Sequence, residues 1–196
     1  MNTSKTPFAV SRRTALAGLS AGSLGIALGT QSGRAAQAMS TADHPLMGVW
    51  LAMANAPRRD QDPQYPAPSI FAADGTVILS FVPAQINMQG ELQFTGSPLG
   101  VWEPYDAQTG HFTVVQVLVD KDGHLAGSLT IDGHPKVNAD GMTFTDDGSL
   151  VTVTIRDPTG KVVNVIPPTK GTPVTAIKMR VGNPGFPGDE NATPVP

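Results

Sequence analysis

Short runs of apolar and β-branched residues, separated by turn residues, recur along the chain from about residue 47 onward. Glycine adopts positive φ without steric cost and aspartate caps its own turn, so Asp-Gly pairs between such runs favour hairpin connections. The pairs are Asp74-Gly75, Asp122-Gly123, Asp132-Gly133, Asp140-Gly141 and Asp147-Gly148. The pattern predicts strands near 47–54, 69–73, 76–82, 99–105, 111–119, 124–131, 149–156, 161–166 and 173–181, with a short one at 142–145.

The alternation within these strands indicates which faces are covered. In 149–156, Val and Ile alternate with Thr and Arg, which predicts one dry face and one wet face. Both faces of 111–119 are largely apolar, so we expect both to be covered. Evenly spaced short strands with turn signals predict an all-β fold, either an antiparallel sandwich or a barrel. Residues 55–68 and 83–98, rich in Pro, Gln and Asn, are expected to be long loops.

The first 38 residues differ from the rest in charge and hydropathy. They contain Lys5, Arg12, Arg13 and Arg34 and no acidic residue, and an apolar stretch at 14–30 is followed by Ala36-Gln37-Ala38. Small residues at the first and third positions before the cut are what signal peptidase requires. The Arg12-Arg13 pair looks like the twin-arginine export motif. We therefore expect a signal peptide at 1–38, a mature protein beginning at Met39, and a periplasmic or secreted location.

Removal of that segment changes the charge balance. Four of the 13 basic residues leave with it, and 9 remain against 16 acidic residues. This excess of negative charge opposes binding to nucleic acid or to an anionic membrane. The chain has no cysteine, so no disulfide supports the domain expected at 39–182. The tail at 183–196 is rich in Pro and Gly and offers little to bury, so we expect it to be disordered.

Two tryptophan motifs carry a resemblance to a known family. Gly48-Val49-Trp50 opens the first expected strand, Arg180 lies near the end of the last, and Gly100-Val101-Trp102 repeats the motif. This arrangement resembles the lipocalins, in which a Gly-x-Trp on the first strand packs beneath an Arg from the closing strand. The longer pattern is similar to that of bacterial exported lipocalin-like (calycin-like) barrels, through Phe71-Ala72-Ala73-Asp74-Gly75-Thr76, Gly100-Val101-Trp102, Asp120-Lys121-Asp122-Gly123 and Gly127. The resemblance implies a single antiparallel up-and-down β-barrel of about eight to nine strands with an apolar lumen. It also implies that Trp50 and Arg180 are structural residues.

The sequence contains one candidate group of catalytic residues. No Gly-x-Ser-x-Gly occurs after residue 38, and no phosphate-binding glycine loop occurs. The histidines show no His-x-His or Glu-x-x-His spacing, so we expect no metal and no cofactor. Glu103, Tyr105 and His111 lie close together if strands 99–105 and 111–119 form a hairpin, with Tyr105 nearest to His111. A carboxylate, a phenol and an imidazole together can move a proton.

Two function classes remain open, with a third for the assembly. The first is a barrel that binds a small apolar or amphipathic molecule in its lumen, with Trp102, Tyr105 and Phe112 as ligand-binding residues. The second is an isomerase, cyclase or lyase that acts on a hydrophobic substrate in the same cavity through Glu103, Tyr105 or His111. The third is an accessory subunit whose two-sided strand 111–119 supplies a homodimer surface.

Overall fold

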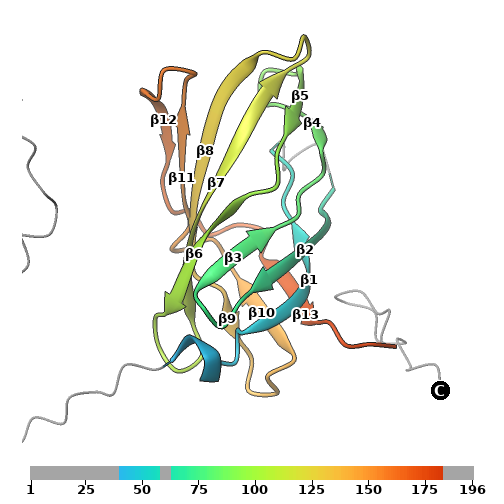
Figure 1. Ribbon diagram of the computed structural model, residues 1–196, viewed down its shortest axis with the longest axis vertical. Helices are drawn as coiled ribbons and strands as arrows, with labels where there is room; N and C mark the ends of the chain where they lie inside the picture. The colour runs from blue at the N-terminus through green and yellow to red at the C-terminus, as the bar shows by residue number, and fades with distance from the viewer. Residues whose placement is uncertain (1–39, 58–62, 183–196) are drawn as a thin grey trace, which may run out of the picture. The chain divides into compact units, whose positions relative to one another are not determined.

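One antiparallel sheet makes up almost all of the regular structure in the computed structural model, which describes residues 40–57 and 63–182 (Figure 1). The expected signal peptide at 1–38 and the expected tail at 183–196 lie outside the described residues. The one helical element within the described ranges is the 3-10 helix η1 (Thr41–Asp43), and none there is long and apolar enough to cross a membrane. The strands are β1 (Gly48–Ala54), β2 (Tyr65–Phe71), β3 (Thr76–Leu79), β4 (Ala84–Ile86), β5 (Leu92–Thr95), β6 (Leu99–Pro104), β7 (Gly110–Asp120), β8 (Leu125–Gly133), β9 (Lys136–Val137), β10 (Thr143–Asp146), β11 (Thr152–Arg156), β12 (Val162–Ile166) and β13 (Val174–Lys178).

The sheet curls into an open half-barrel. Its strands follow the order β12-β11-β8-β7-β6-β3-β2-β1-β13-β10-β9, and the β4–β5 hairpin attaches to this path through β5 and β7. The predicted all-β antiparallel class is therefore confirmed. The prediction of a closed barrel with eight to nine strands is wrong, because the main path alone has eleven strands and its two ends do not pair along their length.

The reason for the missing closure lies where β8 ends. The chain turns at His134 and Pro135 into the two-residue strand β9, which pairs with β10. A single bridge, Thr109–Lys136, and the hydrogen bonds that flank it connect β9 back to the start of β7. Residues Ser128–Asp132 of β8 instead pair with β11, which carries β12 as a free edge (Figure 1). The sheet thus closes on itself at one end only.

The concave face of the curl holds the core. Trp50, Phe71, Trp102, Val114 and Phe144 are buried there, and their aromatic rings contact one another. Both indole N–H groups are satisfied by carbonyl oxygens, at 2.7 Å for Trp50 and 2.8 Å for Trp102. Buried polar groups without partners are unfavourable, so these two bonds allow both tryptophans to lie in the core.

The convex face carries a row of exposed apolar side chains. In the strand register, Val49, Ile70, Ile78, Leu99 and Val115 lie opposite one another across five neighbouring strands. They are between 38% and 56% exposed. The expectation that both faces of strand 111–119 are covered is therefore wrong within this chain, since the core covers only the concave side of β7.

Three local predictions also need correction. β2 begins within the expected loop 55–68 and contains Pro66 and Pro68, which is tolerated because β3 pairs only with Ser69–Phe71 and leaves the prolines with one partner strand. The expected loop 83–98 contains the β4–β5 hairpin. Asp132-Gly133 is not a turn but the end of β8.

Candidate functional site

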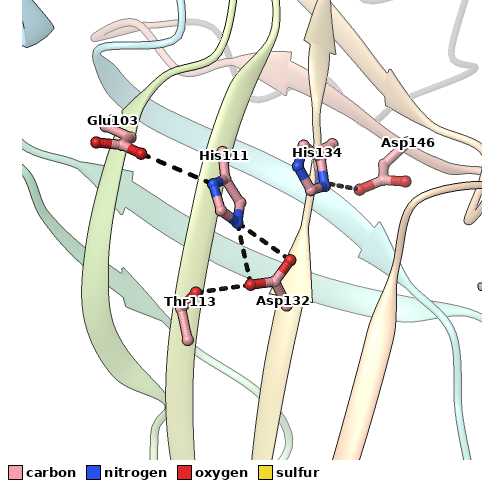
Figure 2. A network of polar contacts seen from close by, with 6 residues as sticks. All are labelled: Glu103, His111, Thr113, Asp132, His134 and Asp146. Atoms are coloured by element: carbon pink, nitrogen blue, oxygen red, sulfur yellow. Dashed lines mark hydrogen bonds and ion pairs between the residues drawn. The ribbon is translucent and has the colours of Figure 1, made fainter. Parts of the chain in front are cut away.

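Three strands bring a group of polar side chains together on the convex face (Figure 2). β6 and β7 pair so that Glu103 lies opposite His111, and β7 and β8 pair so that Thr113 lies opposite Asp132. Directly opposed residues of an antiparallel pair point to the same face. His134 follows Asp132 by two positions and therefore lies on the same side of the chain. We call these five residues the histidine cluster.

His111 is the centre of the hydrogen bonding. Its Nε2 lies 3.1 and 3.0 Å from the two oxygens of Asp132, and the Thr113 hydroxyl donates to the same carboxylate at 2.8 Å. A carboxylate only accepts hydrogen bonds, so in this arrangement Nε2 of His111 carries the proton. Nδ1 of His111 faces Glu103, with 3.9 Å between the nitrogen and Oε1. The imidazole is thus held between two carboxylates.

His134 is held differently. Its ring stacks on His111, with 4.4 Å between centroids and 7° between planes, and the edge of Tyr105 meets it at 5.2 Å. Its backbone N–H donates to Asp146 at 3.0 Å, which ties the end of β8 to β10. Nδ1 of His134 is buried and has no hydrogen-bond partner. The ring is fixed by packing, while one of its nitrogens remains chemically unused.

The buried His44 shows the contrast. Its Nδ1 accepts from the backbone N–H of Leu46 at 3.1 Å, and its Nε2 donates to the carbonyl of Asp106 at 3.0 Å. Both nitrogens are satisfied by the backbone, and the ring packs against Trp102. His44 is therefore a structural residue, whereas the two histidines of the cluster are not bound in this way.

The charge around the cluster is negative. The carboxylates of Glu103 and Asp132 flank the His111 imidazole, and Asp146 accepts from the backbone N–H of His134; among the described residues no Lys or Arg bonds to these groups. The side chains of His111 and Asp132 are 32% and 35% exposed, so solvent and small ions reach them. Such a site attracts cations.

The predicted catalytic residues come to one face but in a different register. Glu103, rather than Tyr105, lies opposite His111, because Tyr105 bonds to Thr109 in the turn between β6 and β7. Tyr105 is 62% exposed and contacts His134 instead. All three residues lie on the convex face and not in the concave space.

The predicted ligand-binding residues are divided between the faces. Trp102 is buried in the core, and Phe112 packs against Phe71 with 6.0 Å between ring centroids. Tyr105 lies on the opposite face of the sheet. The three side chains therefore do not line a common surface.

The cation that lies over Trp50 is not Arg180, the residue expected from the sequence. Trp50 is fully buried, but the ammonium group over its ring, at 5.2 Å, belongs to Lys178. Lys178 also donates to the carbonyl of Pro45 at 3.0 Å, and burial together with nearby Arg180 lowers its pKa. Arg180 is exposed and its guanidinium contacts the sulfur of Met142. The register explains this difference, since Lys178 is the residue directly opposite Trp50.

Asp132 and His134 belong to the cluster but are not among the residues predicted from the sequence. Their Asp-x-His spacing places two polar side chains on one side of an extended chain, which is a pattern that can be searched for. The pair differs from the His-x-His and Glu-x-x-His spacings, and Asp132-Gly133 has the composition of a turn. The stacking of His134 on His111 depends on the pairing of β7 with β8, which the spacing alone does not reveal.

A second surface lies on the concave side of the open half. Leu129 and Ile131 of β8 point to the same side as buried Val114, and Val153 and Ile155 of β11 lie opposite them. All four are only partly buried. Tyr65 of β2 faces the same side, packs on Phe81, and has its pKa raised to about 12 by burial.

Searches against protein-family models, curated proteins and solved structures gave no match for this chain.

Proposed function

We propose that this protein binds a small apolar or amphipathic molecule against the concave face of its half-barrel, in the manner of a lipocalin-like protein. The observation that carries the proposal is the partly buried apolar surface formed by Leu129, Ile131, Val153 and Ile155. These side chains lie on the same face of the sheet as the packed core, beyond the point where that core ends. Apolar area left in contact with water in a concave surface is where an apolar ligand gains most from binding.

One polar group on the same face can contribute to recognition of an amphipathic ligand. The phenol of Tyr65 is partly buried and is a hydrogen-bond donor beside the apolar side chains. A few polar groups in an apolar surface fix the orientation of a ligand. The lipocalin-like assignment is supported by the pairing of β1 with β13 and by the buried Gly-x-Trp tryptophan with a cation above it.

A titration with an environment-sensitive apolar fluorophore tests the proposal. We expect the wild type to enhance the fluorescence saturably and a long-chain fatty acid to displace the dye. Ile155→Asn, on the concave face of β11, should weaken dye binding about tenfold through loss of apolar contact. Val165→Asn, on the exposed side of the neighbouring strand β12, is the matched control and should bind like the wild type.

Two results would overturn the binding proposal: no saturable binding by the wild type, or equal affinities of the two variants. Thermal unfolding of each variant shows that the comparison is made between folded proteins. The alternative of an isomerase, cyclase or lyase in the concave space gains no support from Glu103, Tyr105 and His111, because these residues lie on the convex face.

We also propose export by the twin-arginine route, with cleavage before Met39. The support is the Arg12-Arg13 pair, the absence of acidic residues from 1–38, and Ala36-Gln37-Ala38 as the cleavage site. Replacing Arg12 and Arg13 together by Lys keeps the positive charge and should stop export. Fractionation and N-terminal sequencing of the exported protein check this, and unchanged export of the double variant would show a different route.

A further inference from the structure

We infer that His111, Asp132 and His134 form a binding site for a divalent transition-metal ion of the zinc class. A ligand atom from each of the three residues lies within 4.8 Å of the other two. The inference is independent of the proposed ligand on the concave face, because these side chains lie on the convex face (Figure 2). It differs from the expectation of no metal, which rested on the spacing of the histidines in the sequence.

The donor set selects the ion. Two imidazole nitrogens and one carboxylate suit Zn²⁺, Ni²⁺ and Cu²⁺, whereas Mg²⁺ and Ca²⁺ prefer oxygen ligands alone. Three protein ligands on a partly exposed face leave at least one coordination position for water. The negative charge of Glu103 and Asp132, which both contact His111, offsets the charge of the ion.

The surrounding contacts are those that a metal-binding histidine needs. A metal ion at Nε2 of His111 replaces the proton now shared with Asp132, and the ring proton then lies on Nδ1, which faces Glu103. A carboxylate behind a ligating imidazole fixes its tautomer and orientation. The hydroxyl of Thr113 holds the Asp132 carboxylate at 2.8 Å in the same way.

His134 supplies an independent observation. Its buried Nδ1 has no hydrogen-bond partner in the stacked arrangement. An unpaired buried nitrogen destabilises the state that contains it, so the ring gains by leaving the stack for a position in which both nitrogens have partners. Metal binding at the cluster provides such a position. The backbone bond to Asp146 keeps the residue in place while the ring turns.

The stacking of His134 on His111 also determines which side chain must move when a metal ion binds. The lone pair of an imidazole nitrogen lies in the ring plane, so two parallel rings at 7° cannot both direct a lone pair at one ion. Ligands of a tetrahedral ion with bonds near 2.1 Å lie about 3.4 Å apart. The Nε2–Asp132 distance of 3.0 Å is close to this value, whereas the site as a whole spans up to 4.8 Å. Binding must therefore unstack His134 from His111.

Calorimetric titration of Zn²⁺ into the untagged, chelator-treated protein tests the inference. We expect one ion per chain with a micromolar or lower Kd, and visible ligand-field bands when Co²⁺ is used instead. His111→Ala and His134→Ala should each weaken binding by at least tenfold and abolish the Co²⁺ bands. Glu103→Gln should weaken binding by about tenfold through its effect on His111.

The matched control is His124→Ala. His124 is a surface histidine with a carboxylate, Asp120, at 3.4 Å, but it belongs to no such cluster. This variant should bind Zn²⁺ like the wild type. His134→Gln serves beside His134→Ala, because it keeps more of the side-chain volume and the packing against Tyr105. Circular dichroism confirms that each variant is folded.

A second readout follows the unstacking. In a ¹H–¹⁵N spectrum of the histidine rings, Zn²⁺ should shift the signals of His111 and His134 and leave those of His44 unchanged. The inference is overturned if the wild type binds no Zn²⁺ at micromolar concentration. It is also overturned if folded His111→Ala and His134→Gln bind as tightly as the wild type, or if His124→Ala removes the binding.

Discussion

The contact between Trp50 and Lys178 can be measured as a contribution to stability. Trp50 is fully buried, its indole N–H donates to the carbonyl of Leu46 at 2.7 Å, and the Lys178 ammonium lies 5.2 Å from the ring centroid. Trp50→Ala should lower the free energy of unfolding by about 3 to 5 kcal/mol, the usual cost of removing a large buried aromatic side chain. Lys178→Met keeps the aliphatic stem and removes the cation, so it should cost about 0.5 to 2 kcal/mol.

A double-mutant cycle separates the cation–π contact from the remaining effects. We combine Lys178→Met with Trp50→Leu, which removes the ring but keeps an apolar side chain, and expect a coupling of about 0.5 to 1 kcal/mol. Arg180→Met is the matched control, because Arg180 is a neighbouring cation of the same chain segment that contacts Met142 instead. Its coupling to Trp50 should be close to zero.

Urea unfolding followed by far-ultraviolet circular dichroism gives each free energy without relying on tryptophan fluorescence. The reasoning is refuted if Arg180→Met couples to Trp50 more strongly than Lys178→Met does. A loss below 1 kcal/mol in Trp50→Ala would refute the place of Trp50 in the core.

Three further predictions concern pH and association. Burial raises the pKa of Tyr65 from 10.0 to about 12, so its contribution to stability is complete below pH 10.0 and is lost as the pH rises toward 12. The urea midpoint measured as a function of pH should show this loss in the wild type and not in Tyr65→Phe. The hydrogen bonds from the backbone N–H of His124 and of Asp122 lower the pKa of Asp120 from 3.8, so the stability they contribute above that pH is lost as the pH falls below it. Asp120→Asn should therefore reduce the loss of Tm at acid pH when Tm is measured as a function of pH. β12 is an exposed edge strand with apolar side chains, so Val163→Lys should raise the protein concentration at which light scattering detects association.

The strands that the sequence predicts well are those whose alternation follows from burial of one face. β1, β6 and β7 agree with their predicted ranges to within one residue, because their buried and exposed positions alternate between clear turns. β2 was placed too late, since its prolines resemble a loop until the one-sided pairing of that segment is known. The β4–β5 hairpin is partly exposed and its strands have only three and four residues, so the alternation of Leu92 and Phe94 with polar residues is too short to mark it.

Long-range register accounts for what the sequence does not reveal. Lys178 and Arg180 occupy the same face of the last part of the chain, and only the pairing of Trp50 with Lys178 decides which cation covers the ring. In the same way, Glu103 and Tyr105 are two residues apart, and the register of β6 with β7 decides which lies opposite His111. The open edge follows from the choice of β11 as the partner of β8, a contact between separate hairpins.

The position of β13 has a consequence for how the chain folds. This last strand lies inside the sheet, between β1 and β10, so residues 48–54 cannot complete their strand pairing before residues 174–178 have been synthesised. Contacts of such sequence separation slow folding, because the entropy of ordering the intervening chain is lost before they form. A chain still lacking residues 174–178 exposes two strand edges and separates the β9–β10 hairpin from β1. Synthesis interrupted before that point therefore leaves an aggregation-prone intermediate, and the domain reaches its native sheet only after translation has passed Lys178.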